Sequence, residues 1–149
     1  MNEQGTSRIA GPFFEGNLVH LLDVERLWQL ARELEVFEVS IDDLSDFDSD
    51  EPWHGHGADT PTCQSVAPHA KRIQNCDLTF PIILSSESYV LDGMHRVAKA
   101  WISGLKTVSA IQFDEPVDPD LVLQVKGRID PRNLEPLVHA VLLEWSSSQ

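Results

Sequence analysis

The chain has 149 residues, 42% of them hydrophobic, which suits one globular domain with a substantial core. Its 11 basic and 24 acidic residues give a formal charge of −13, and so acidic a surface repels DNA phosphates and anionic membranes. Unaided DNA binding and membrane association are therefore disfavoured. The two cysteines, Cys63 and Cys76, match no metal or redox spacing, and no apolar run reaches membrane-helix length, so we expect a cytoplasmic protein.

The first part of the chain is predicted to hold an arm, a helix and a strand. Residues 1–16 contain three glycines and a proline and predict an irregular arm. Asp23 can cap a helix whose apolar side chains recur at helical spacing over residues 24–34. Apolar and polar residues then alternate over residues 37–42, which predicts a half-buried strand.

An acidic segment follows this strand. From Asp42 to Glu51, six of ten residues are acidic, and the sequence stays polar to Pro61, with glycines at 55 and 57. We predict a long loop over residues 42–60. Loops of this length within a compact domain are usually functional or mobile.

The middle of the chain is predicted to alternate helices and short strands. A helix is expected over residues 65–75, since Pro68 is tolerated in its first turn. The further elements, in order, are strands over 81–84 and 89–91, a helix ending near Ser103 with Gly104 as a left-handed stop, and a strand over 108–113.

The last part of the chain is predicted to hold a linker-like turn over residues 114–120, a strand over 121–125 and a helix over 134–145. Together the elements predict an α+β fold, a small mixed sheet covered by helices. We expect a single domain over residues 1–149. It consists of an amino-terminal arm and helix (1–35), a core (36–113) and a carboxy-terminal extension with a helix (114–149).

The most informative stretch runs from Tyr89 to Ile102. It predicts a strand, a one-glycine turn at Gly93, and a helix whose first turn carries His95 and Arg96. Such a turn forms an anion pocket, because backbone N–H groups and the positive end of the helix dipole face the same point. The alternative is a capped helix with a salt bridge between Asp92 and Arg96.

The order of these elements over residues 36–113 resembles the ParB/sulfiredoxin superfamily. The resemblance is carried by an acidic loop, a helix, Pro81-Ile-Ile-Leu84, a strand and Asp92-Gly-Met-His-Arg96 before a further helix and strand. The corresponding turn is Gly-Glu-Arg-Arg in ParB domains, Gly-Cys-His-Arg in sulfiredoxins and Asp-Gly-His-His-Arg in the free-serine kinases, which this chain matches best. The resemblance implies a ParB/sulfiredoxin-like fold that binds ATP, ADP or CTP phosphates on this turn.

The residues of the turn suit that ligand. Gly93 allows close approach of the backbone, Met94 lies beside it in the turn, and Arg96 can contact a phosphate through two N–H groups. His95 can donate a further hydrogen bond. Lys99, one turn later, either adds charge at the rim of the site or is a solvated helix residue.

Two departures from the superfamily restrict the chemistry. Met94 stands where sulfiredoxins have their nucleophilic cysteine, and a thioether cannot attack a phosphate or resolve a sulfinic acid. ParB proteins continue into a DNA-binding helix-turn-helix and a dimerisation domain, whereas about 35 residues follow the motif core here. Sulfiredoxin chemistry and chromosome partitioning are therefore poor fits.

The remaining activity that the resemblance implies is phosphoryl transfer to a small hydroxyl compound such as a free amino acid. This reaction needs a phosphate clamp, Mg²⁺ and a carboxylate that orients the acceptor hydroxyl. In the serine kinases a glutamate soon after the first strand supplies that carboxylate. The matching segment here favours Glu51, then Asp48, while Asp92 can hold Mg²⁺ or the acceptor.

Several alternatives stay open. The acidic segment can be no more than a solvated loop, and the chain can be a nucleotide-sensing or protein-interaction module without catalysis. His69 can line the same pocket, although a surface or capping role is favoured. Trp101 is expected to pack in the core on an apolar helix face. The sequence does not indicate the oligomeric state.

Overall fold

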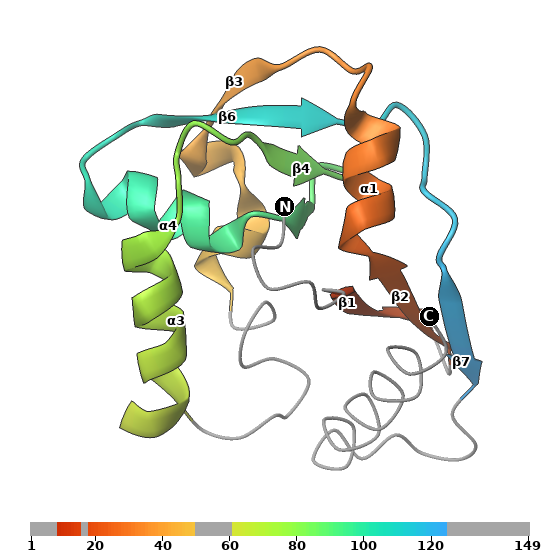
Figure 1. The fold of residues 1–149 in the computed structure, drawn as a ribbon, viewed down its shortest axis with the longest axis horizontal. Helices are drawn as coiled ribbons and strands as arrows, with labels where there is room; N and C mark the ends of the chain where they lie inside the picture. Colours follow the sequence, from red (N-terminus) through yellow and green to blue (C-terminus); the bar gives the residue numbers. More distant parts are fainter. Residues whose placement is uncertain (1–8, 16–17, 50–60, 125–149) are drawn as a thin grey trace. The chain divides into compact units, whose positions relative to one another are not determined.

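The computed structural model describes residues 9–15, 18–49 and 61–124 (Figure 1). It confirms the α+β class at that level, because helices and two β-sheets occur in the described part of the chain. The chain divides into two compact units. The first unit comprises residues 1–30, 56–59 and 118–149, and the second comprises residues 31–55 and 60–117.

The first unit contains a three-stranded antiparallel sheet of β1 (Ile9–Glu15), β2 (Leu18–Asp23) and β7 (Leu121–Gln124), with β2 in the centre. The predicted irregular arm is therefore wrong for residues 9–15, and β2 has no counterpart among the predicted elements. The proline of this segment lies where the β1–β2 register shifts, between Ala10 and Phe13. An edge strand tolerates proline at such an irregularity, so the glycines and proline do not prevent pairing.

Helix α1 (Val24–Ala31) follows β2 directly. The predicted cap is confirmed, since the Asp23 carboxylate accepts a hydrogen bond from the Glu25 N–H at 2.9 Å. The helix ends three residues earlier than the predicted residue 34. Arg26 joins the start of α1 to the segment before β7, because it donates to the Asp118 carbonyl at 2.9 Å and to the Asp120 carboxylate at 2.8 Å.

The sheet of the second unit is mixed, as predicted. Its strands lie in the order β3 (Phe37–Ser40), β6 (Thr107–Gln112), β4 (Ile82–Leu84) and β5 (Val90–Asp92). The β3–β6 and β4–β5 pairs are antiparallel, and the β4–β6 pair is parallel. The apolar run after Pro81 forms the fully buried strand β4, which confirms that prediction.

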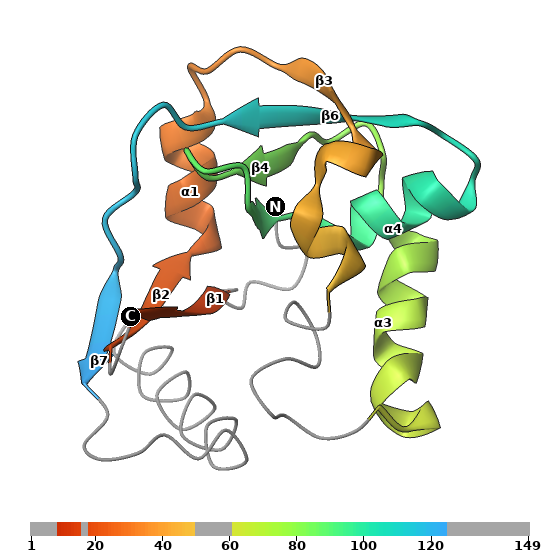
Figure 2. The same ribbon diagram turned by 180° about the vertical axis from the view of Figure 1, so that it is seen from behind.

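Helices α3 and α4 lie in the described part of this unit, and they pack against each other (Figure 1 and Figure 2). Helix α3 (Cys63–Asn75) begins two residues before the predicted start, because Thr62 caps it, and Pro68 consequently lies beyond the first turn. Helix α4 (Met94–Ile102) ends close to the predicted position. Gly104 has a φ of +80°, as expected for a left-handed stop.

The described part of the acidic segment is not a plain loop. It forms two short 3₁₀ turns, η1 (Ile41–Asp43) and η2 (Ser45–Asp48). The reason is packing, because Ile41 and Leu44 are buried at the starts of successive turns and draw the backbone onto the core. Residues 50–60 and the helix predicted over 134–145 lie outside the described residues.

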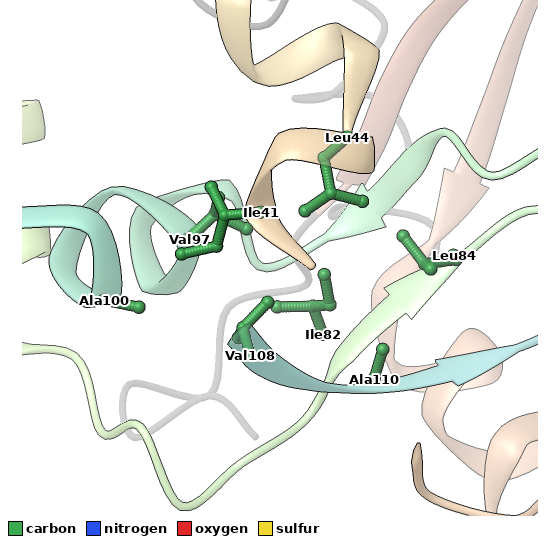
Figure 3. Close-up of a cluster of buried hydrophobic side chains, with 8 residues drawn as sticks. All are labelled: Ile41, Leu44, Ile82, Leu84, Val97, Ala100, Val108 and Ala110. Atoms are coloured by element: carbon green, nitrogen blue, oxygen red, sulfur yellow. The ribbon is translucent and has the colours of Figure 1, made fainter. Parts of the chain in front are cut away.

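The core of the second unit lies between α4, the 3₁₀ turns and the two inner strands (Figure 3). Its buried side chains are Ile41, Leu44, Ile82, Leu84, Val97, Ala100, Val108 and Ala110. Burial of Val97 and Ala100 fixes α4 against the sheet. The same packing therefore sets where the first turn of α4 lies.

Trp101 does not pack in this core, contrary to expectation. It follows the buried Ala100 by one residue, which turns its side chain about 100° round the helix. It is 61% exposed, and its ring meets Phe47 edge-on with centroids 5.9 Å apart. Over the described ranges, no helix has both the length and the hydropathy needed to cross a membrane.

Candidate functional site

The candidate site is the junction between β5 and α4. Gly93 is the N-cap of α4 and has φ 112° and ψ 17°, a left-handed conformation that favours glycine. No side chain caps this helix end. The cap position itself therefore contributes only backbone, as glycine does in many anion-binding turns.

Gly93 is also tightly enclosed. A Cβ atom at this position would lie 2.7 Å from Ile82 Cγ2 and 2.9 Å from Arg96 Nη2. Any side chain here would have to displace the buried strand β4 or the guanidinium. Both the conformation and the space at this turn therefore require glycine.

The first turn of α4 has a positive electrostatic character. The N–H groups of Arg96 and Val97 both donate to the Gly93 carbonyl, at 2.9 and 3.1 Å. The hydrogen bonds within the helix begin with these two groups, so the N–H groups before them have no carbonyl of the helix to bind. The first turn contains no acidic residue. The turn itself therefore carries no acidic side chain against the positive end of the helix dipole, and the carboxylate of Asp92 lies immediately before it in the chain.

Arg96 folds back over the turn. Its Nη2 lies 3.2 Å from Asp92 Oδ2, and the two side chains are only 13% and 12% exposed. The salt bridge considered as an alternative is therefore present. A guanidinium has five N–H donors, so holding Asp92 and contacting a phosphate are compatible roles for one arginine.

His95 is joined to a second histidine on another helix. His69 Nδ1 and His95 Nε2 lie 2.9 Å apart, and both residues are partly buried. His69 therefore pairs with a residue of the turn, and a place for His69 in a phosphate pocket stays a prediction. The two histidines are 26 residues apart in the chain, so no local sequence pattern indicated this pairing.

The other two residues predicted to bind phosphate lie elsewhere around α4. Met94 packs its side chain against the hydrophobic core, so only its backbone belongs to the turn. The Lys99 ammonium donates to the carbonyls of Gln74 and Cys76, at 3.2 and 2.6 Å, at the end of α3. A role for Lys99 at the phosphate stays a prediction.

Cys76 is the cysteine that the fold brings toward these cations. Burial raises the pKa of its thiol, and the nearby charges of Lys99 and Arg96 oppose that rise without cancelling it. The thiol donates to the Ile73 carbonyl at 3.2 Å. Cys76 is consequently protonated at neutral pH and is a poor nucleophile.

The acidic segment reaches the site through a residue that the sequence did not favour. Asp46 Oδ2 accepts a hydrogen bond from the Val90 N–H on β5 at 2.7 Å, and no donor among the described residues reaches its buried Oδ1. Asp48 is exposed on η2, which packs against α4. Glu51 lies outside the described residues. Asp46 is thus the carboxylate that ties η2 to the strand entering the turn.

Asp92 is the residue predicted to hold Mg²⁺. Within the described ranges no three His, Cys, Asp or Glu side chains gather as a metal site. Mg²⁺ in nucleotide sites is commonly held by one or two carboxylates, with phosphates and waters completing the shell. The position of Asp92 beside the turn fits this arrangement.

Comparison of the chain with models of protein families, with curated proteins and with solved structures finds no match.

Proposed function

We propose that this chain is a ParB/sulfiredoxin-like protein that binds a nucleotide, ATP or ADP, by its phosphates at the β5–α4 junction. CTP is the third nucleotide that the resemblance implies. The observation that carries the proposal is the uncapped first turn of α4, entered through a left-handed and enclosed Gly93 and flanked by His95 and Arg96. Two reduced thiols, Cys63 and Cys76, favour the cytoplasm as its compartment.

Each residue of the junction has a defined part in this proposal. Gly93 lets the phosphate approach the backbone, the first-turn amides donate to its oxygens, and Arg96 and His95 add charged or polar donors. Asp92 would hold Mg²⁺ together with the phosphates. The metal would offset phosphate charge, and Asp92 would then exchange part of its contact with Arg96 for the cation.

The further step is transfer of the terminal phosphoryl group to a small hydroxyl compound, with a free amino acid as the model acceptor. As the acceptor oxygen bonds to phosphorus and the nucleotide leaves, a carboxylate takes the hydroxyl proton. Glu51 and Asp48 are the predicted carboxylates, and the contact of Asp46 with β5 adds a third candidate. Binding without transfer would make the chain a nucleotide-sensing or protein-interaction module instead.

The binding step is tested by thermal unfolding with and without nucleotide. With Mg²⁺ and ADP at ~100 times the Kd, ligand linkage stabilises a protein by about 2.7 kcal/mol, or roughly 5–10 °C for a chain of this size. We expect Arg96→Ala to remove that shift. Arg32→Ala, an exposed arginine of the same unit, is the matched control and should keep it.

Two results would contradict the proposal. Wild type that shows no nucleotide-linked stabilisation does not bind at these concentrations. Arg96→Ala that keeps the full shift places the site elsewhere. Turnover then separates the kinase from the sensing module, because a bound nucleotide that is never consumed in the presence of amino acids and other hydroxyl compounds indicates binding alone.

A further inference from the structure

The described strands of the second unit's sheet leave one edge at β3 and the other at β5, and the two edges differ. On the β5 edge, the Val90 N–H donates to Asp46 Oδ2 at 2.7 Å, so a side chain occupies a backbone donor of the edge strand. Beyond β3, no strand within the described ranges continues the sheet (Figure 1 and Figure 2). An unpaired edge of this kind can add another extended segment through backbone hydrogen bonds.

The pairing of β3 with β6 shows which backbone groups face outward. The Ile41 N–H donates to the Lys106 carbonyl at 3.0 Å, in register with the antiparallel β3–β6 pair. Residues of such a pair face the partner strand alternately, so every second residue back from Ile41 also faces β6. The N–H groups of Glu38 and Ser40 therefore point away from the sheet, and no acceptor among the described residues binds them.

Apolar side chains accompany this edge. Val36, just before β3, is 53% exposed, and Phe37, the first residue of β3, is 40% exposed. Val39 lies on the same face of the strand as Phe37 and packs against the core. A segment that paired with β3 would place every second side chain beside Phe37 and Val39, which favours apolar residues at those positions.

The surroundings of the edge are acidic. Residues 31–43 contain five carboxylates and one arginine, and all five carboxylates are exposed. These carboxylates belong to Glu33, Glu35, Glu38, Asp42 and Asp43. Within the described part of the chain they form no ion pair. Lys106, opposite Ile41, adds one cation at the end of β3, so the charge along the edge is negative overall.

This charge decides which occupant suits the edge. Two copies of the chain paired through β3 would bring the carboxylate of Glu38 and its neighbours close to their own equivalents. Like charges across a strand pair are destabilising, so an acidic edge resists pairing with itself. A segment with basic side chains gains from the same carboxylates, and its recognition is favoured by charge complementarity.

We propose that the free edge of β3 binds an extended segment of a partner protein in which apolar and basic residues alternate. The backbone of the segment pairs with the outward groups of Glu38 and Ser40. Its apolar side chains lie beside Phe37, and its lysines or arginines lie beside Glu38, on the opposite face. The inference does not depend on the nucleotide site, which belongs to the other edge of the sheet, where β5 leads into α4.

Ser40 offers a substitution that blocks the edge and keeps the sheet. Its φ of −68° and ψ of 133° already suit proline, and its N–H is not one of those that face β6. Ser40→Pro therefore removes an outward donor and adds a ring that obstructs a paired strand. Ser40→Ala is the matched control, because it removes the hydroxyl and keeps the N–H. Both variants should unfold with a thermal midpoint near that of the wild type.

The binding test uses a fluorescent, acetylated peptide of alternating lysine and valine, about six residues long, which is the usual length of a strand. It is titrated into the full chain and followed by anisotropy. We expect Ser40→Ala to bind like the wild type and Ser40→Pro to bind about tenfold more weakly. In ¹H–¹⁵N spectra of the wild type, the largest amide shifts should fall on residues 36–40.

Further comparisons test the chemistry of the occupant. Glu38→Gln should weaken binding about two- to threefold at low salt and less at high salt, since the charge is exposed and screened. Glu87→Gln, an exposed glutamate in the turn before β5, should leave binding unchanged. A peptide with glutamate in place of lysine, or with N-methylated backbone amides, should not bind.

Several results would overturn the inference. A wild type that does not bind the lysine–valine peptide at millimolar concentration lacks this activity. Equal binding by Ser40→Pro, or of the N-methylated peptide, places the cationic peptide elsewhere on the acidic surface. Self-association of the wild type that Ser40→Pro abolishes makes a second copy the occupant instead. The effect of Arg96→Ala on nucleotide-linked stabilisation is measured separately, so none of these outcomes decides the proposed function.

Discussion

Helices α3 and α4 of the second unit begin in opposite ways. The start of α3 is closed by its own side chains, because the Ser65 N–H donates to Thr62 Oγ1 at 3.0 Å and the Thr62 N–H donates to Ser65 Oγ at 2.9 Å. The start of α4 has only Gly93 and no side-chain cap. The start of α3 thus has a side-chain partner for one of its first-turn amides, and the cap position of α4 has none.

The packing of the two helices explains why this difference is tolerated. No residue of α3 is buried, so that helix depends on its capping box and on its packing against α4. Helix α4 buries Val97, Ala98 and Ala100, and this packing holds the helix without a cap. A helix fixed by the core can leave its first turn for a ligand, whereas an exposed helix cannot.

Gly93→Ala is the substitution with the largest expected effect on this comparison. The added Cβ meets Ile82 and Arg96 and also occupies a left-handed conformation, so we expect a loss of about 3 kcal/mol or more in the free energy of unfolding. Gly104→Ala is the matched control, because its φ is also positive but nothing lies within 4 Å of the added atom. It should cost about 1 kcal/mol from backbone strain alone.

Urea unfolding of the two variants measures this difference. A similar loss for both glycines would mean that conformation alone, without close packing, requires glycine at position 93. The junction would then be less rigid than the contacts with Ile82 indicate.

The features that were predicted correctly from the sequence are those that depend on neighbouring residues. The cap at Asp23, the buried strand after Pro81, the turn at Gly93 and the stop at Gly104 each depend on a few neighbouring residues. Local chemistry decides such features, so they can be read without knowing the fold.

The features that were missed depend on partners far along the chain. Asp46 meets Val90 across 44 residues, and His69 meets His95 across 26, so both pairings require α3, η2 and β5 to have packed around α4. The β1–β2 pairing was hidden by glycines and a proline that a strand accepts only at an irregular edge. These surroundings of the candidate site thus depend on tertiary structure.

A smaller effect is expected at the capped helix. Thr62→Ala removes one half of the capping box, and we expect a loss of about 1 kcal/mol in the free energy of unfolding. Nucleotide-linked stabilisation should be unchanged, because the proposed anion site is at the start of α4. Thr107→Ala, an exposed threonine on β6, controls for removal of the side chain. Loss of nucleotide binding in Thr62→Ala would break the contrast between the two helix ends.

The smallest effect concerns the turn that follows α3. Asp77 Oδ1 accepts hydrogen bonds from the backbone N–H of Thr79 at 2.9 Å and from its hydroxyl at 2.7 Å. The backbone bond, followed by the hydroxyl bond, lowers the pKa of Asp77 below the ordinary aspartate value. Because the folded pKa is the lower one, the stabilisation is fully present above the unfolded value of about 3.9 and is lost as the pH falls through the folded pKa.

Asp77→Asn tests whether the turn after α3 is held by the side chain of Asp77. We expect the variant to be slightly less stable than the wild type at pH 6, and the difference to shrink as the pH falls from about 4 toward 2.5. Chemical denaturation of both proteins over this range measures the difference, with Asp114→Asn as an exposed control. A difference that stays constant would show that the amide loses packing rather than a charge-assisted bond. The end of α3 would then be held chiefly by Lys99, through its contacts with Gln74 and Cys76.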